Sequence, residues 1–232
     1  MKKLVSLMLA ALMLFAMVPA VAESIPTGTW YLVEIIREGE SVNPSMIDLS
    51  ASVVLNEDGS ARLLSTYGEE TEEISAVWAA DGNQITVTEE DGEETKFDLE
   101  GDRLNMKQVD GIMSFSQDPE APSILAIHPV TAESEEDFLG NWTVAQVGVM
   151  GSLMYAENVG ISRSLVIEPG QAAVSYDGET VTGPTVLQDG QLKIVYSDGS
   201  ERTIVLNDNG QLSETMDSAG QELILYFAKT EE

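Results

Sequence analysis

Hydrophobic and polar residues alternate along most of this chain with a period of two. Successive side chains of a strand point to opposite faces of a sheet, so the alternation predicts strands with one buried face. Serine, threonine and charged residues occupy the intervening positions. The apolar positions of the first stretch are Val53, Leu55, Ala61, Leu63, Ile74, Ala76, Trp78, Ile85, Val87, Phe97, Leu99, Leu104, Met106, Met113 and Phe115.

Short turn sequences separate the predicted strands. Asp81-Gly82, Asp91-Gly92 and Asp110-Gly111 each lie between two apolar runs. Such pairs tolerate the positive φ that tight hairpins require. Loops this short cannot carry a parallel crossover, so the pattern predicts an antiparallel up-and-down sheet. Closing about eight strands into a barrel would also remove the exposed sheet edges.

The pattern occurs twice in the chain. Gly28-Thr29-Trp30 recurs as Gly140-Asn141-Trp142, and the closing Phe115 recurs as Phe227. Two copies of about 90 residues follow, each long enough to fold without disulfides. The fold class expected is all-β, with two tandem antiparallel eight-stranded barrels.

These barrels are assigned to residues 23–116 and 139–232, with an acidic, proline-containing linker at residues 117–138. In the linker, Ser134 and Asp137 have the spacing of a cap for one helical turn. The predicted strands have about 5 to 8 residues, fewer than the roughly 9 to 11 of a membrane barrel. We therefore expect no membrane insertion.

Each copy has one irregular stretch after its first strand. Asn43 and Pro44 predict a short helix with asparagine at the cap and proline at the first position. The counterpart in the second copy is residues 152–160. Gly183-Pro184 falls where the first copy has a regular strand, so that strand is expected to be broken, bulged or at an edge.

Residues 1–22 have the features of a cleaved signal peptide. Lys2 and Lys3 precede an apolar run, and Ala20-Val21-Ala22 forms a cleavage site before Glu23. The apolar run is shorter than the roughly 20 residues that a spanning helix needs. The sequence therefore predicts a secreted, extracytoplasmic protein.

Charge and composition exclude several classes of partner and of catalytic site. The chain has 40 acidic and 11 basic residues, a net charge of −29, and no cysteine. A surface this acidic repels phosphate backbones, so we expect no nucleic-acid partner. The absence of cysteine excludes thiolate catalysis and zinc–thiolate sites. The one histidine, His128, lies in the linker, where we expect no catalytic role.

A Gly-x-Trp motif on the first strand, a short helix in the first loop and an eight-strand meander together resemble the lipocalin-like domains of exported bacterial proteins. The resemblance implies that Trp30 and Trp142 plug the closed end of each barrel. It also implies that Gly28 and Gly140 allow the chain to approach closely there. Neither copy has an arginine on its last strand to stack on the tryptophan.

Candidate ligand-binding residues lie at the mouth of each predicted barrel. Methionine suits adaptable apolar surfaces, and five soft or amphipathic side chains occur in the loops after the first strands. They are Met46, Ile47, Met150, Met154 and Tyr155. The alternative is that these residues only cap the hydrophobic core.

Three functions remain open. The first is an exported, non-catalytic module that holds a small apolar or amphipathic ligand at a barrel mouth. The second is a structural or protein-binding surface factor with filled barrels and an extracellular protein partner. The third is a hydrolase with paired carboxylates, which requires two inward carboxyl groups in one cleft. We expect a monomer without cofactor or resident metal, and weak surface calcium binding stays open.

Overall fold

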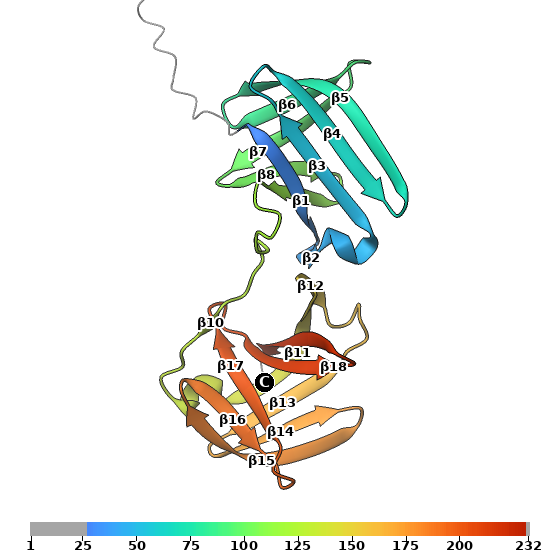
Figure 1. Ribbon diagram of the computed structural model, residues 1–232. Helices are drawn as coiled ribbons and strands as arrows, with labels where there is room; N and C mark the ends of the chain where they lie inside the picture. Colours follow the sequence, from blue (N-terminus) through green and yellow to red (C-terminus); the bar gives the residue numbers. More distant parts are fainter. Residues whose placement is uncertain (1–26, 231–232) are drawn as a thin grey trace, which may run out of the picture.

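A computed structural model describes residues 27–230, and its regular structure is almost entirely β-strand (Figure 1). The all-β prediction is therefore confirmed. The predicted signal peptide at residues 1–22 lies outside the described residues. Within residues 27–230, no helix has the length and apolar character needed to cross a membrane.

Eight strands of the first half, residues 28–116, close into an antiparallel barrel. β1 pairs with both β3 and β9, and each strand from β3 to β9 pairs with the next. β2 forms a hairpin with β1. The strands are β1 (Gly28–Arg37), β2 (Glu40–Val42), β3 (Leu49–Leu55), β4 (Ser60–Tyr67), β5 (Glu70–Asp81), β6 (Gln84–Glu89), β7 (Glu94–Glu100), β8 (Arg103–Gln108) and β9 (Gly111–Ser116).

The strands of the second half, residues 140–229, pair in the same order. β11 pairs with β12, β13 and β19, and each strand from β13 to β19 pairs with the next. β10, in the linker, pairs with β17. The strands are β10 (Pro129–Val130), β11 (Gly140–Val149), β12 (Ser152–Tyr155), β13 (Arg163–Glu168), β14 (Gln171–Tyr176), β15 (Glu179–Gln188), β16 (Gln191–Val195), β17 (Glu201–Asn207), β18 (Leu212–Ser218) and β19 (Gln221–Lys229).

The two Gly-x-Trp motifs occupy equivalent register positions. Trp30 lies opposite Val53, and Trp142 lies opposite Leu165. Both tryptophans are buried. The pairing of β1 with β9 shifts register just after Leu32, and the pairing of β11 with β19 shifts just after Val144. The repeated sequence therefore gives repeated strand pairing.

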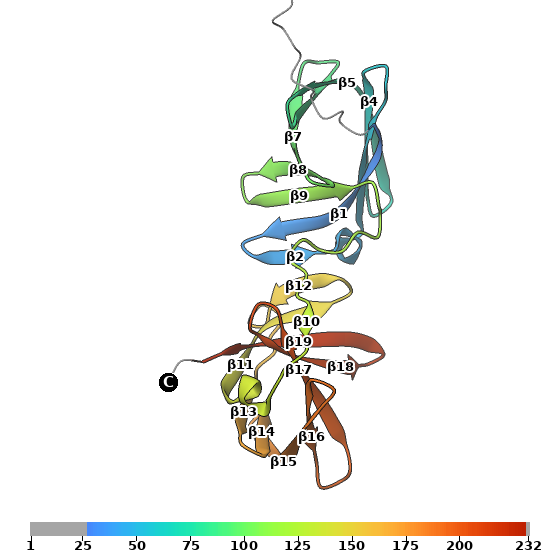
Figure 2. The same ribbon diagram turned by 90° about the vertical axis from the view of Figure 1, so that its left-hand side faces the viewer.

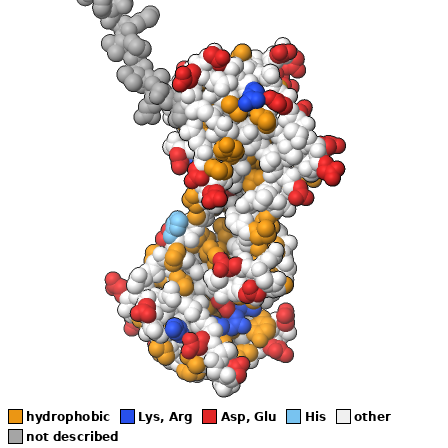
Figure 3. Space-filling model, in the orientation of Figure 1, with side chains coloured by type: hydrophobic (Ala, Val, Ile, Leu, Met, Phe, Trp, Pro, Cys, Tyr) orange, Lys and Arg blue, Asp and Glu red, His pale blue; other side chains and the backbone are white. Residues whose placement is uncertain are grey.

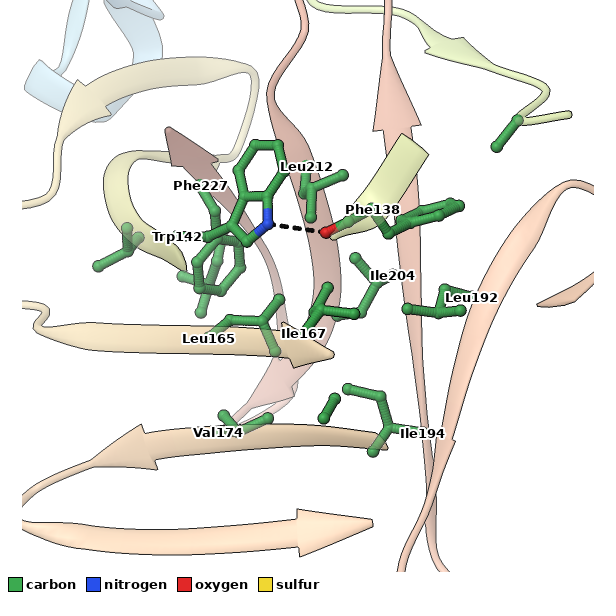
Figure 4. Packing of buried hydrophobic residues seen from close by; sticks show 14 of the residues in the cluster. Phe138, Trp142, Leu165, Ile167, Val174, Leu192, Ile194, Ile204, Leu212 and Phe227 are labelled. Atoms are coloured by element: carbon green, nitrogen blue, oxygen red, sulfur yellow. Dashed lines mark hydrogen bonds between the residues drawn. The ribbon is translucent and has the colours of Figure 1, made fainter. Parts of the chain in front are cut away.

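Each half has a hydrophobic core of its own. The first is built around Trp30, Phe97 and Phe115, and the second around Trp142 and Phe227. In the second core the indole N–H of Trp142 donates to the carbonyl of Phe138 at 2.8 Å (Figure 4). This bond ties the end of the linker to the first strand that follows it.

Two short 3-10 helices form at predicted places. η1 (Pro44–Ile47) begins after Asn43, whose side chain accepts from the Ser45 N–H at 3.0 Å. η2 (Glu135–Phe138) follows Ser134, whose N–H donates to the Asp137 carboxylate at 3.0 Å. Residues 152–160 differ from their counterpart in the first half. They begin with strand β12 and continue as turns, whereas η1 follows the corresponding strand β2 in the first half.

The predicted interruption at Gly183-Pro184 is not a break. β15 runs continuously through both residues. It pairs with β14 up to Pro184 and with β16 from Thr185 onward. Proline has no N–H to donate, and it stands where the strand changes partners. Of the three predicted outcomes, a break is therefore excluded, while Pro184 is paired on one side only, as at a sheet edge.

The two halves meet through their short second strands. Figures 1 and 2 show β2 next to β12, with the linker running beside them from one half to the other. Ser41 of β2 lies opposite Leu153 of β12 in an antiparallel pair. The loops at this end of each half are therefore close to one another.

Candidate functional site

A pocket of about 240 Å³ lies inside the first half. Its wall includes five large apolar side chains from four strands: Leu63, Phe97, Met106, Met113 and Phe115. The rings of Phe97 and Phe115 meet edge to face, with their centroids 5.8 Å apart. Alternation places all of these side chains on the inward face, so the core pattern of the sequence also builds the pocket wall.

A few polar groups complete the wall of this pocket. Ser65, Glu72 and Thr95 contribute to its lining. Ser65 lies opposite Ala51 in the pairing of β3 with β4, and Thr95 lies opposite Val87 in the pairing of β6 with β7. The pocket therefore has an apolar body with a small number of hydrogen-bonding groups, as is common in sites for small molecules.

A second pocket, of about 570 Å³, occupies the corresponding position in the second half. Arg202 lies opposite Ile194 there, as Thr95 lies opposite Val87 in the first half. Glu214 and Met106 each follow by two residues the leucine that pairs with the closing phenylalanine. The same region of both halves is thus hollow, but the chemistry of its lining differs.

Glu214 is the centre of a buried charged cluster in the second half. Its carboxylate accepts from Nη1 of Arg163 at 3.0 Å and from Nη1 of Arg202 in a shorter contact. The Arg163 guanidinium lies 5.3 Å from the centroid of the Tyr176 ring. The guanidinium of Arg202 lies 5.9 Å from the ring centroids of both Tyr176 and Tyr196. These contacts compensate part of the cost of burying three charges.

Tyr196 has a buried hydroxyl group for which the described part of the chain provides no hydrogen-bond partner. Burial raises the pKa of Tyr196, so the phenol keeps its proton and remains a donor at neutral pH. Burial opposes the charge on Arg202, but the Glu214 carboxylate outweighs it and raises the pKa of Arg202. The pocket therefore combines a neutral phenol donor with a permanently charged guanidinium.

The five residues predicted at the barrel mouths line neither interior pocket. Two of them lie at the junction between the halves instead. The Ser152 hydroxyl contacts Sδ of Met46 at 2.8 Å, and the N–H of Tyr155 donates to Oε1 of Glu40 at 2.7 Å. The loops predicted to carry ligand-binding residues thus contact each other.

The other three predicted residues are more dispersed. Ile47 is exposed on η1, and Met154 is half-buried on β12. Met150 is exposed and lines a groove between the linker and the loops of the second half. The structure therefore does not gather the five residues into one site.

A lysine that the sequence pattern did not single out lies beside the tryptophan of the second half. Nζ of Lys229, on the last strand, lies 5.3 Å from the centroid of the Trp142 ring. A Cβ on Gly140 would lie 2.7 Å from Cε of Lys229, so the end of the lysine side chain would have to shift. Gly140 also has a φ of +130°, which favours glycine. A search for arginine alone could not find this lysine.

The buried acidic residues of the described range do not form a carboxylate pair. Within residues 27–230 the buried acidic side chains are Glu34 and Glu214, and they lie in different halves. Glu34 accepts from the Ser41 hydroxyl at 2.5 Å and from the N–H of Ile124 at 3.1 Å. His128 is exposed, and its backbone N–H donates to Asp208. In the described range no cluster of three or more His, Asp or Glu is placed to hold a metal ion.

Comparison with known proteins gives only distant similarities. No protein-family model matches the chain, and no curated protein matches its sequence. The Cpx pathway activator NlpE from Escherichia coli is similar at 11% identity, covering 87% of this chain and 91% of that one, with a TM-score of 0.28. A protein of unknown function from the DUF3598 family of Nostoc punctiforme has 11% identity over 88% and 96% of the two chains, with a TM-score of 0.30.

Proposed function

We propose that the protein is an exported, non-enzymatic binding module of two tandem lipocalin-like barrels. In this proposal the first barrel holds a small apolar or amphipathic molecule in its interior pocket. The observation that carries the proposal is the apolar pocket among Leu63, Met106 and Met113, with its counterpart at the same register position in the second half.

The tandem arrangement is supported by the strand pairing. Both halves have eight strands in cyclic order, a hairpin after the first strand and a register shift at the same place. Export is supported by the sequence of residues 1–22, with its two lysines, apolar run and Ala-x-Ala site. An exported chain without cysteine depends on packing for stability, and each half has a separate core for that purpose.

A non-enzymatic role is supported by the state of the buried acidic groups. The Glu214 carboxylate is bound by two arginines, and the Glu34 carboxylate by two serines and a backbone N–H. A general base needs a free lone pair within reach of a substrate proton. Both carboxylates are instead held in place by internal hydrogen bonds, and that of Glu214 is also paired with two arginines.

The ligand class follows from the volume and lining of the first pocket. A volume of about 240 Å³ fits a molecule of a few carbon atoms rather than a long lipid. Met106 and Met113 have flexible, polarisable side chains that can adjust to its shape. Ser65 and Thr95 offer hydrogen bonds to a single polar group.

The test uses mature protein labelled with ¹³C at the methionine methyl groups and titrated with 1-butanol. We expect the methyl resonances of Met106 and Met113 to shift saturably. Met150 is exposed in the other half, so its resonance should not move. Ala51→Phe should abolish the shifts by filling the pocket, because the second half accommodates the large side chain of Arg163 at this register position. Ser50→Phe places the same ring at the adjacent exposed position and is the matched control.

Two results would contradict the proposed ligand site. One is an absence of saturable change at Met106 and Met113. The other is binding that Ala51→Phe leaves intact. Either result would favour the alternative, a structural or protein-binding factor in which the barrels serve only as scaffolds.

A further inference from the structure

The interior of the second half contains more positive than negative charge. Arg163 and Arg202 share one carboxylate, that of Glu214, and the side chains of Arg163, Arg202 and Glu214 are 10%, 25% and 4% exposed. Buried charge is costly unless it is paired. One positive charge is therefore left without an internal partner at the pocket.

The acidic residues at the rim do not supply the missing charge inside the pocket. Asp198 and Glu201 line the pocket but are exposed, so water screens them. The Asp198 carboxylate is also occupied, because Oδ1 accepts from the hydroxyl of Ser200 at 2.6 Å and from its N–H at 2.9 Å. A small anion inside the pocket would neutralise the cluster more effectively.

Two residues that line the pocket have donor groups without a partner in the described chain. Within the described chain, Arg202 uses only Nη1 in its contact with Glu214, which leaves the N–H groups of Nε and Nη2. The Tyr196 hydroxyl has no partner there. The Arg202 guanidinium lies 5.9 Å from the Tyr196 ring centroid, so the two side chains are neighbours in the pocket wall. A carboxylate has two oxygens and can accept from a guanidinium and a phenol together.

The rest of the wall favours an organic anion over a bare inorganic ion. Val181, Met216 and the ring of Tyr176 line the pocket beside these donors. Apolar side chains gain free energy by covering a hydrocarbon group, and a free inorganic ion has none. The volume of about 570 Å³ is large enough for a ring and its carboxylate.

We infer that the pocket of the second half binds a small organic carboxylate, held by the Tyr196 hydroxyl and the Arg202 guanidinium. The first half has no counterpart of this site, because Glu89 and Thr95 occupy the equivalent strand positions in β6 and β7. The inference goes beyond the apolar ligand proposed for the first half and does not depend on it.

The test is a calorimetric titration of the mature protein with benzoate, and benzamide is the neutral control of the same shape. We expect benzoate to bind with one-to-one stoichiometry and benzamide at least tenfold more weakly. Tyr196→Phe removes only a hydroxyl that lacks a partner, so the melting temperature should not fall. Its affinity for benzoate should fall at least fivefold.

Tyr226→Phe is the matched control, since Tyr226 is a buried tyrosine that lies outside this pocket. It should leave the affinity for benzoate unchanged. The inference is overturned if benzoate does not bind, if benzamide binds equally well, or if Tyr196→Phe binds as tightly as the wild type. The butanol titration reports on Met106 and Met113 in the first half, and the benzoate titration reports on the pocket of the second half. Each proposal can therefore be rejected independently of the other.

Discussion

The charged residues Arg163, Arg202 and Glu214 show the limit of what the sequence predicts about single inward positions. Alternation placed Tyr176 and Tyr196 on the inward face of their strands, in step with the apolar residues. Arg163, Arg202 and Glu214 stand in the same phase, two residues from Leu165, Ile204 and Leu212. They were not identified because a charged side chain in a strand ordinarily faces water. Such a side chain is buried only when it has a partner of opposite charge. Here the arginines and the glutamate lie on three separate strands, so their pairing is not visible in the local sequence.

Replacing Glu214 by methionine tests whether this cluster contributes to stability. Met106 occupies the equivalent position in the first half, so the new side chain suits the architecture. Glu214→Met leaves two buried guanidinium groups without their carboxylate, and we expect the free energy of unfolding to fall by about 3 kcal/mol. Urea denaturation measures the change. Glu168→Met, at an exposed position on β13, is the control and should change stability by less than about 0.5 kcal/mol.

The same experiment can separate lost pairing from poor packing. Adding Arg163→Ala and Arg202→Thr to Glu214→Met reproduces the residues Ala51, Thr95 and Met106 of the first half. If unpaired charge causes the loss, the triple variant recovers most of the stability that the single variant lost. A triple variant as unstable as Glu214→Met would show that packing, not charge, dominates.

At the level of elements, local patterns located the strands but not their partners. Alternation and Asp-Gly turns marked most strands, and the Asn43-Pro44 cap marked η1. The strand at Ser152–Tyr155 escaped detection because it forms by pairing with β11 and with β2 of the other half. No local pattern specifies a contact made by residues so far apart in sequence. The same limit applies to β15, whose continuity depends on two different neighbours.

Adjacent residues of β15 should respond differently to the same substitution. A Cβ on Gly183 would lie 2.5 Å from the carbonyl oxygen of Val195, a backbone atom that cannot move alone. Gly183→Ala should therefore lower the free energy of unfolding by about 2 kcal/mol. Pro184 is exposed, so Pro184→Ala should change it by less than about 0.5 kcal/mol. Thermal or urea denaturation measures the stability of both variants. An equal loss of stability in the two would contradict the close approach of Gly183 to the Val195 carbonyl.

For the whole molecule, the junction between the halves combines apolar and polar contacts. Acidic side chains are spread over both halves, while hydrophobic ones gather near the narrow middle of the face in Figure 3. The N–H of Asn43 donates to the Ser152 hydroxyl at 2.7 Å, and Ser123 of the linker donates to Glu34. Repulsion between two acidic bodies is thus opposed by specific hydrogen bonds and by the linker.

Glu40 makes the most specific of these contacts. Its Oε1 accepts from the N–H of Tyr155 at 2.7 Å and from Nδ2 of Asn158 at 2.8 Å. Hydrogen bonds to a charged group contribute about 1.5 to 3 kcal/mol. Glu40→Ala should therefore loosen the contact between β2 and β12 without unfolding either core, because Glu40 lies outside both clusters.

Amide hydrogen exchange and small-angle scattering measure the two consequences. In Glu40→Ala the Tyr155 amide should exchange at least tenfold faster, and the radius of gyration should rise as the halves separate. Glu38→Ala is the matched control, since Glu38 contacts Tyr155 through its backbone carbonyl and keeps that contact. Exchange at Leu165 and Val53, deep in the two cores, should stay slow in both variants. An unchanged radius with fast Tyr155 exchange would mean that the linker contacts at Glu34, not Glu40, hold the halves together.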